Sequence, residues 1–197
     1  MNNKPDPIQA TNKHILDKEI PKSKRNIFKV LIIIIVIIVL SIGVYYVRQY
    51  LVARSNAQKI EQITVQTSAL VDEGKFSEAI AIWQEFLDEP LSADAKCTAT
   101  LRYANTLNNS GKYADANEVT IIVQSDCKKV SKYDVTLQLA KSYEGEGNIL
   151  KAIENYDALI AMEKEMQQNP PRGFDKAKSE EKVKNYEEIV SVLRLNI

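Results

Sequence analysis

The chain has 197 residues, and its 26 basic and 26 acidic residues cancel to a net charge of zero at pH 7. The charges are unevenly placed: residues 1–29 hold seven basic and three acidic residues, which leaves nineteen basic and twenty-three acidic residues beyond them. This mildly acidic remainder argues against nucleic-acid binding, which requires a clustered basic face.

Residues 1–26 contain three prolines and too few apolar residues to build a core. We expect them to form a disordered cytoplasmic tail. A cluster of basic residues beside the apolar segment that follows is interpreted as a topology signal, and binding of anionic lipid headgroups is the alternative. The cluster consists of Lys22, Lys24, Arg25 and Lys29.

Residues 30–47 are eighteen uncharged residues, of which only Ser41 has a truly polar side chain. A helix of this length covers about 27 Å, close to the thickness of the hydrocarbon core of a bilayer. We predict a transmembrane helix over residues 27–47 and a helical connector over residues 48–59, because a lone strand in lipid would leave its backbone unpaired. A cleaved signal peptide is disfavoured, since Arg48 and Arg54 separate the apolar run from the small residues Ser55 and Ala57.

Basic residues also indicate the orientation of this helix. Residues 10–29 contain six of them and residues 48–67 contain three, and the richer flank is expected to stay in the cytoplasm. The sequence thus predicts a single pass through the plasma or inner membrane, with the C-terminal domain extracytoplasmic. No Gly or Pro occurs between Arg48 and Glu73, which allows the membrane helix to continue directly into the next helix.

An internal repeat follows the connector. Gly74, Gly111 and Gly147 are spaced 37 and 36 residues apart, and large apolar or aromatic residues recur four before and two and twelve after each glycine. Each unit is therefore interpreted as helix, turn and helix, in which the glycine permits a positive φ. An alanine five residues after the glycine would let the two helices approach closely. These alanines are Ala79, Ala116 and Ala152.

The repeat resembles the tetratricopeptide repeat (TPR) family over residues 60–168. The resemblance implies an all-α fold, in which the single transmembrane helix precedes an α-solenoid of about three TPR-like helical hairpins. Asn117 and Thr120 replace apolar residues and make the middle unit the weakest match, and unrelated helical hairpins are the alternative. Residues 169–197 are predicted to form a loop and a capping helix, with Asp175 as its N-cap.

Two cysteines, Cys97 and Cys127, fall near the start and the end of the second unit. In an antiparallel hairpin these two points lie at the same end, so we predict a disulfide between them, which an extracytoplasmic location permits. It would close a loop of about 31 residues and contribute about 3 to 4 kcal/mol by the loop-entropy model. Two unrelated buried thiols are the alternative.

Catalytic motifs are scarce. The only histidine, His14, lies in the tail, so the outer domain has no imidazole for base catalysis, for activating a nucleophile or for a zinc site. No Gly-rich phosphate loop or calcium-binding spacing occurs, and we expect no enzyme, no metal and no cofactor. An enzyme would need a carboxylate pair from among Asp72–Glu73, Glu180–Glu181 and Glu187–Glu188.

The TPR resemblance implies a concave surface, lined by the first helix of each hairpin, that binds a protein or peptide partner. The carboxylate clamp of some family members is not reproduced here, and the oligomeric state is open. The layout is similar to bacterial inner-membrane TPR proteins that accompany the Sec translocon, which suggests a scaffold or adaptor assisting protein translocation or envelope assembly. A fixed structural subunit of a secretion, pilus or division complex is the alternative. Candidate partner-binding residues are Arg102, Asn105, Asn109, Gln138, Lys141 and Glu144, with Thr64, Ser68, Leu101 and Leu137 beside them.

Overall fold

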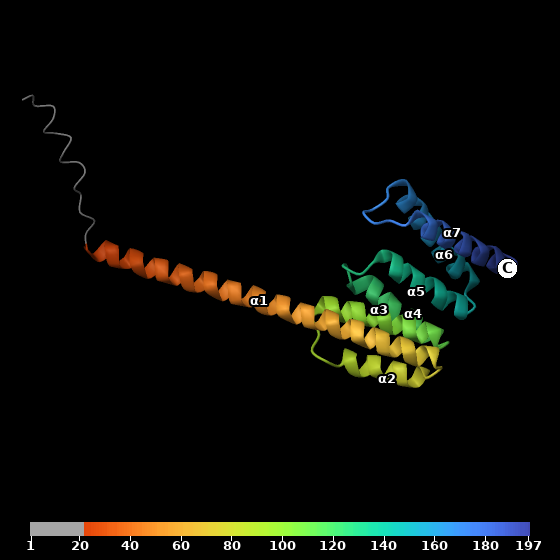
Figure 1. The fold of residues 1–197 in the computed structure, drawn as a ribbon, viewed down its shortest axis with the longest axis horizontal. Coiled ribbons are helices and arrows are strands. Elements are labelled where there is room, and N and C mark those ends of the chain that lie inside the picture. Colours follow the sequence, from red (N-terminus) through yellow and green to blue (C-terminus); the bar gives the residue numbers. More distant parts are fainter. Residues whose placement is uncertain (1–21) are drawn as a thin grey trace, which may run out of the picture. The chain divides into compact units, whose positions relative to one another are not determined.

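The computed structural model describes residues 22–197, with side chains from Lys29 onward. This part of the chain is all-helical and contains no strand (Figure 1). The predicted disorder of residues 1–21 lies outside the described residues, whereas residues 22–26, also assigned to the tail, are helical. The helices are α1 (Lys22–Asp72), α2 (Phe76–Leu87), α3 (Ala93–Asn109), α4 (Tyr113–Asp126), α5 (Lys132–Gly145), α6 (Ile149–Gln168) and α7 (Lys176–Arg194).

α1 continues without a break from the apolar segment to Asp72, as the absence of Gly and Pro allows. The chain divides into two compact units at Tyr50 and Leu51, and α1 contributes to both. In the first unit, the large apolar side chains from Val30 to Val47 are all exposed, and the segment has a mean hydropathy of 3.1. By length and composition, α1 is able to span a membrane. Ser41 donates its hydroxyl to the Ile37 carbonyl (2.8 Å), so this polar group is satisfied within the helix.

Three tight turns in the second unit share one geometry. Gly74, Gly111 and Gly147 have φ angles of 75°, 76° and 75°, as the sequence predicts for these positions. After each glycine, the next backbone N–H donates to a carbonyl five residues earlier, at 2.8 Å in the first turn, 2.9 Å in the second and 2.8 Å in the third. This is the Schellman arrangement, which satisfies the last carbonyls of one helix and turns the chain into the next.

The helices of the second unit pack in chain order. Each helix from α2 to α6 contacts the helix that follows it, and α3 also contacts α5. Ala79, Ala116 and Ala152, the predicted close-approach residues, are fully buried. The single tryptophan, Trp83, packs with Ile60 and Phe86 in a cluster between α1, α2 and α3. The larger cluster covers α5, α6 and α7 and also includes Leu101 of α3 and Val123 of α4; Leu159 is fully buried in it.

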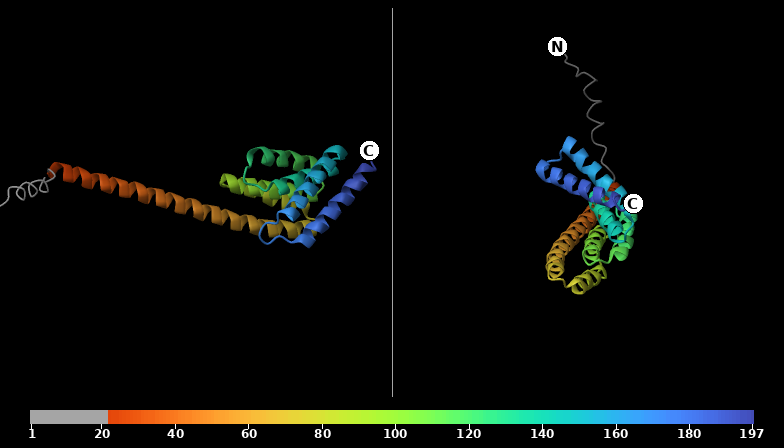
Figure 2. Two further views of the ribbon diagram at one scale, coloured as in Figure 1. Left: turned by 90° about the horizontal axis from the view of Figure 1, so that it is seen from above. Right: turned by 90° about the vertical axis from the view of Figure 1, so that its right-hand side faces the viewer.

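α7 is the predicted C-terminal helix and begins as expected. The Asp175 side chain accepts a hydrogen bond from the backbone N–H of Lys178 (3.1 Å) and caps the helix. The buried stripe of α7 consists of Val183, Val190 and Leu193. The helix α7 lies beside α6 in both Figure 1 and Figure 2. The rest of its surface is largely charged and exposed, so α7 closes one side of the α5–α6 hairpin.

Candidate functional site

Four clefts follow one another along α1, α3, α5 and α7, and we call them together the groove. The α1/α3 cleft has a volume of about 330 Å³ and the α3/α5 cleft about 310 Å³, and Arg102 lines both. A third cleft of about 450 Å³ continues along α3 and α5 at Lys141, and the α5/α7 cleft has about 370 Å³. Glu144 lines these last two. All six predicted site residues therefore border the groove.

The α3/α5 cleft has an apolar floor and a polar rim. Leu101, Leu137 and Val130 provide the apolar surface, and Leu101 is the most deeply buried of the three. On the rim, the exposed Arg102 of α3 lies across the cleft from the exposed Asp134 at the start of α5. This combination suits an apolar side chain with polar groups beside it.

A buried hydrogen-bond network lies beneath this cleft and joins α3 to α5. Asn108 donates to the side-chain oxygen and the backbone carbonyl of Gln138 (3.0 and 3.1 Å), and Ser142 donates to the side-chain oxygen of Asn108 (2.9 Å). Gln138 in turn donates to Asn105 (3.3 Å). Such a satisfied network fixes the register of two helices, because unpaired partners would be costly in the interior.

This network corrects one detail of the sequence interpretation. Gln138 was expected to be an open groove residue, but its side chain is only 6 % exposed and its amide is engaged with α3. Its role is to position the two helices of the groove. Asn105 is half-buried above it, while Arg102 and Asn109 are exposed and Lys141 is half-exposed.

Tyr113 forms part of the third cleft through a close approach between α4 and α5. A Cβ atom at Gly145 would lie 2.2 Å from the Tyr113 ring, so only glycine allows the ring to rest on the end of α5. Tyr113 and Lys141 thereby line the same cleft, with Asn109 on α3. The cleft thus combines one aromatic ring, one cation, the Glu144 carboxylate and the two amides of Asn108 and Asn109.

Glu144 connects the groove to the interior. Its carboxylate accepts a hydrogen bond from the Tyr156 hydroxyl of α6 (2.6 Å). Burial, and then this hydrogen bond, raise the pKa of Tyr156 well above its ordinary value, so the phenol stays neutral and donates. The hydrogen bond from Tyr156 consequently holds the Glu144 carboxylate in place, and Glu144 lines two clefts.

Behind this pair, Glu163 of α6 is a fully buried carboxylate that joins α6 to α7. It accepts hydrogen bonds from Ser179 (2.7 Å) and Lys182 (2.8 Å) of α7. Burial alone would raise the pKa of Glu163, but the hydrogen bonds from Lys182, Ser179 and Tyr133 outweigh it and lower that pKa. Glu163 was not predicted from the sequence, although a charge at the buried helical position after Tyr156, Leu159 and Ile160 was a signal.

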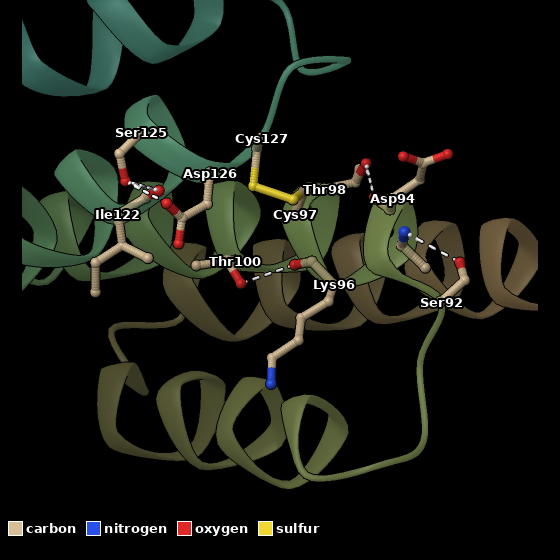
Figure 3. Close-up of a disulfide and its surroundings, with 11 residues drawn as sticks. Ser92, Asp94, Lys96, Cys97, Thr98, Thr100, Ile122, Ser125, Asp126 and Cys127 are labelled. Atoms are coloured by element: carbon tan, nitrogen blue, oxygen red, sulfur yellow. Dashed lines mark hydrogen bonds between the residues drawn. A yellow bond between two sulfur atoms is a disulfide. The ribbon is translucent and has the colours of Figure 1, made fainter.

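Cys97 of α3 and Cys127, which follows α4, are joined by a disulfide, as predicted (Figure 3). Next to it, Lys129 and Asp94 form an ion pair (2.6 Å). The residues after Cys127 form one wall of the α3/α5 cleft. This was not expected from the sequence, because the groove was predicted to be lined by first helices. We call Lys129, Val130 and Ser131 the groove wall.

Acidic groups converge at one point of the groove. Glu144 and Glu188 both line the α5/α7 cleft, together with Asn185, Ile189, Val192 and Leu193. Within residues 29–197, no group of three or more His, Cys, Asp or Glu side chains is arranged to hold a metal ion. The groove thus offers mixed polar and apolar recognition surfaces.

Comparisons with protein-family models, with curated proteins and with solved structures found no match to this chain.

Proposed function

We propose that the chain is a single-pass membrane protein whose extracytoplasmic, TPR-like solenoid binds a protein or peptide partner in the groove. In this role it serves as a scaffold or adaptor that assists protein translocation or envelope assembly. The observation that carries the proposal is the set of clefts along α1, α3, α5 and α7, which all six candidate residues border.

The repeated turns support a TPR-like solenoid. Three hairpins, α1–α2, α3–α4 and α5–α6, end their first helices in the same glycine-centred motif and bury an alanine at the same position of the second helix. Equivalent hairpins that share a register present their first helices side by side, and this creates an extended binding surface. The direct packing of α3 on α5 agrees with such an arrangement.

Three features support the membrane location and orientation. The apolar part of α1 exposes large apolar side chains on every face, which favours lipid over water as its surroundings. The basic residues are concentrated before this segment, which favours a cytoplasmic N-terminus. The disulfide lies on the other side of the segment, and disulfides persist in oxidising compartments outside the cytoplasm.

The groove's chemistry favours a polypeptide partner. Its clefts combine apolar residues, such as Leu101 and Val192, with charged residues, such as Arg102, Lys141 and Glu188, and amides such as Asn109. A peptide presents the same alternation of side chains and backbone groups, and bound side chains of moderate size fit clefts of about 310 to 450 Å³.

Photo-crosslinking in intact cells tests this function. A photo-crosslinking amino acid in place of Arg102 or of Asn109 should give the same discrete product, because both positions border the groove. The matched control replaces Arg172, an exposed residue of the loop before α7, and should give none. Equal products from all three positions, or none from either groove position, would contradict the proposal. A partner recovered at fixed stoichiometry in mild detergent would instead favour a structural subunit.

A further inference from the structure

The groove wall is short and irregular, and its backbone is weakly tied. It lies between the end of α4 at Asp126 and the start of α5 at Lys132. Outside the helices of the described chain, the backbone hydrogen bonds include none donated by residues 128–131. Side chains must therefore hold this segment against α3.

Four side-chain ties are available, and they differ in strength. Val130 is half-buried and packs against the core cluster that includes Leu101 of α3. The Lys129–Asp94 ion pair is 78 % and 61 % exposed, and such pairs contribute little. The Ser131 hydroxyl caps α5 by accepting from the Asp134 N–H (3.3 Å), which fixes one end of the wall to α5 alone. Only the disulfide joins the segment covalently to α3 (Figure 3).

The other end of the disulfide is also part of the groove. Cys97 directly precedes Thr98, which lines both the α1/α3 and the α3/α5 clefts, and lies one helical turn before Leu101 and Arg102. The bond thus fixes the wall directly to the helix that forms the opposite side of the α3/α5 cleft. The disulfide therefore contributes to the shape of the α3/α5 cleft as well as to the stability of the fold.

We propose that the Cys97–Cys127 disulfide is a positioning link for the groove: it holds Lys129, Val130 and Ser131 at the distance from α3 that the partner requires. This inference rests on the proposed function and specifies how that binding surface is shaped. Without the bond, only the packing of Val130 and the exposed Lys129–Asp94 ion pair hold the wall at α3. The wall then samples more positions, and the partner must order it on binding, at a cost in affinity.

The test uses the full chain in its membrane, with the photo-crosslinking amino acid in place of Arg102. Pairing this substitution with Cys97→Ala and Cys127→Ala should lower the crosslinking yield about tenfold. The matched control is Leu159→Ala, which removes a fully buried side chain of α6, a helix that lines none of the four clefts, and destabilises the fold without removing a groove residue. It should retain the yield of the parent chain.

Hydrogen exchange of the same variants in detergent micelles separates the alternatives. Loss of the disulfide should speed exchange at residues 128–134 and leave α6 and α7 protected. Unchanged exchange there, an unchanged crosslinking yield, or an equal loss with Leu159→Ala would each overturn the inference while the proposed function stands. If the parent chain gives no product at position 102 or 109, the proposed function fails and the inference fails with it.

A second variant tests the inference in case the cysteine-free chain does not fold. Insertion of two glycines between Val130 and Ser131 displaces the wall with the disulfide intact, and surface loops tolerate such insertions. It should lower the yield to a similar degree in a chain with normal protection of α6 and α7. Full crosslinking by this variant would overturn the inference.

Discussion

Glu163 is the residue whose side chain decides how α7 attaches to the rest of the domain. Its carboxylate is 1 % exposed and accepts hydrogen bonds from two residues of α7, while Tyr133 of α5 lies against the same group. Burial and then the hydrogen bonds with Tyr186 and Glu163 raise the pKa of Tyr133, so this phenol stays protonated and able to donate. One carboxylate therefore connects three helices.

Glu163→Gln should destabilise the folded chain by about 2 kcal/mol. This is less than the roughly 3 to 5 kcal/mol of a fully buried pair, because Lys182 is 39 % exposed and water can solvate it. The loss of helical circular dichroism with urea, in detergent micelles, measures the change. Lys164 and Glu187 form an exposed ion pair between the same two helices, so Glu187→Gln is the matched control and should cost well under about 1 kcal/mol.

The effect of Glu163→Gln should depend on pH in one direction. Because the folded-state pKa of Glu163 is lowered, its ionisation stabilises the fold above the unfolded-state pKa of about 4.3. That contribution is lost as the pH falls through the folded-state pKa. The difference in stability between the parent chain and Glu163→Gln should therefore be constant near neutrality and shrink below about pH 4. A difference that grew in acid would contradict the lowered pKa.

At the scale of elements, the glycine turns determine where each hairpin reverses. Gly111→Ala should destabilise the domain by about 1 kcal/mol or more, because φ is 76° at this position and a Cβ atom is strained there. Nothing lies within 4 Å of the added Cβ, so the cost reflects the backbone alone. Gly111→Asn should cost less, since asparagine tolerates this conformation. Equal unfolding midpoints for the parent and the alanine variant would show that the turn is not required.

The buried alanines determine how closely the helices of a hairpin approach. Ala152→Phe should cost about 1 to 3 kcal/mol or more, because the large ring has to displace α5 from α6. Ala161→Phe is the matched control on the same helix, where the alanine is exposed, and its effect should be small. Urea unfolding of both variants measures the difference. A neutral Ala152→Phe would mean that the helix register is wrong.

Periodicity explains which of these elements the sequence predicts well. Glycine spacing, the buried alanines and the Asp175 cap are local signals, and each reappears in the structure at the predicted residue. The roles of Gln138 and Glu163 could not be predicted in this way, because they depend on hydrogen-bond partners far away in the chain. Asn108 lies 30 residues from Gln138, and Lys182 lies 19 residues from Glu163. No local pattern identifies such partners, and so the two polar networks became apparent only in the folded chain.

At the scale of the whole molecule, helical periodicity predicts the part of the site that lies on helices and does not predict the part that lies in a loop. The six candidate residues all border the groove, as expected for first helices of equivalent hairpins, although Gln138 is buried and its amide is bonded to α3. The groove wall was missed because it lies in a loop, whose position follows from the disulfide and not from helical periodicity. The proposed function also requires the groove to lie outside the cytoplasm.

Protease accessibility tests the central claim, a binding domain anchored at the outer face of the membrane, most directly. Cells carrying the chain with a C-terminal tag are stripped of any outer barrier and treated with protease while the membrane stays intact. A cytoplasmic protein serves as the control for membrane integrity, and detergent-lysed cells show that the tag can be cleaved. We predict loss of the tagged domain in intact cells, because a basic flank such as the one before α1's apolar segment favours a cytoplasmic N-terminus. Full protection of the tag until lysis would contradict the account.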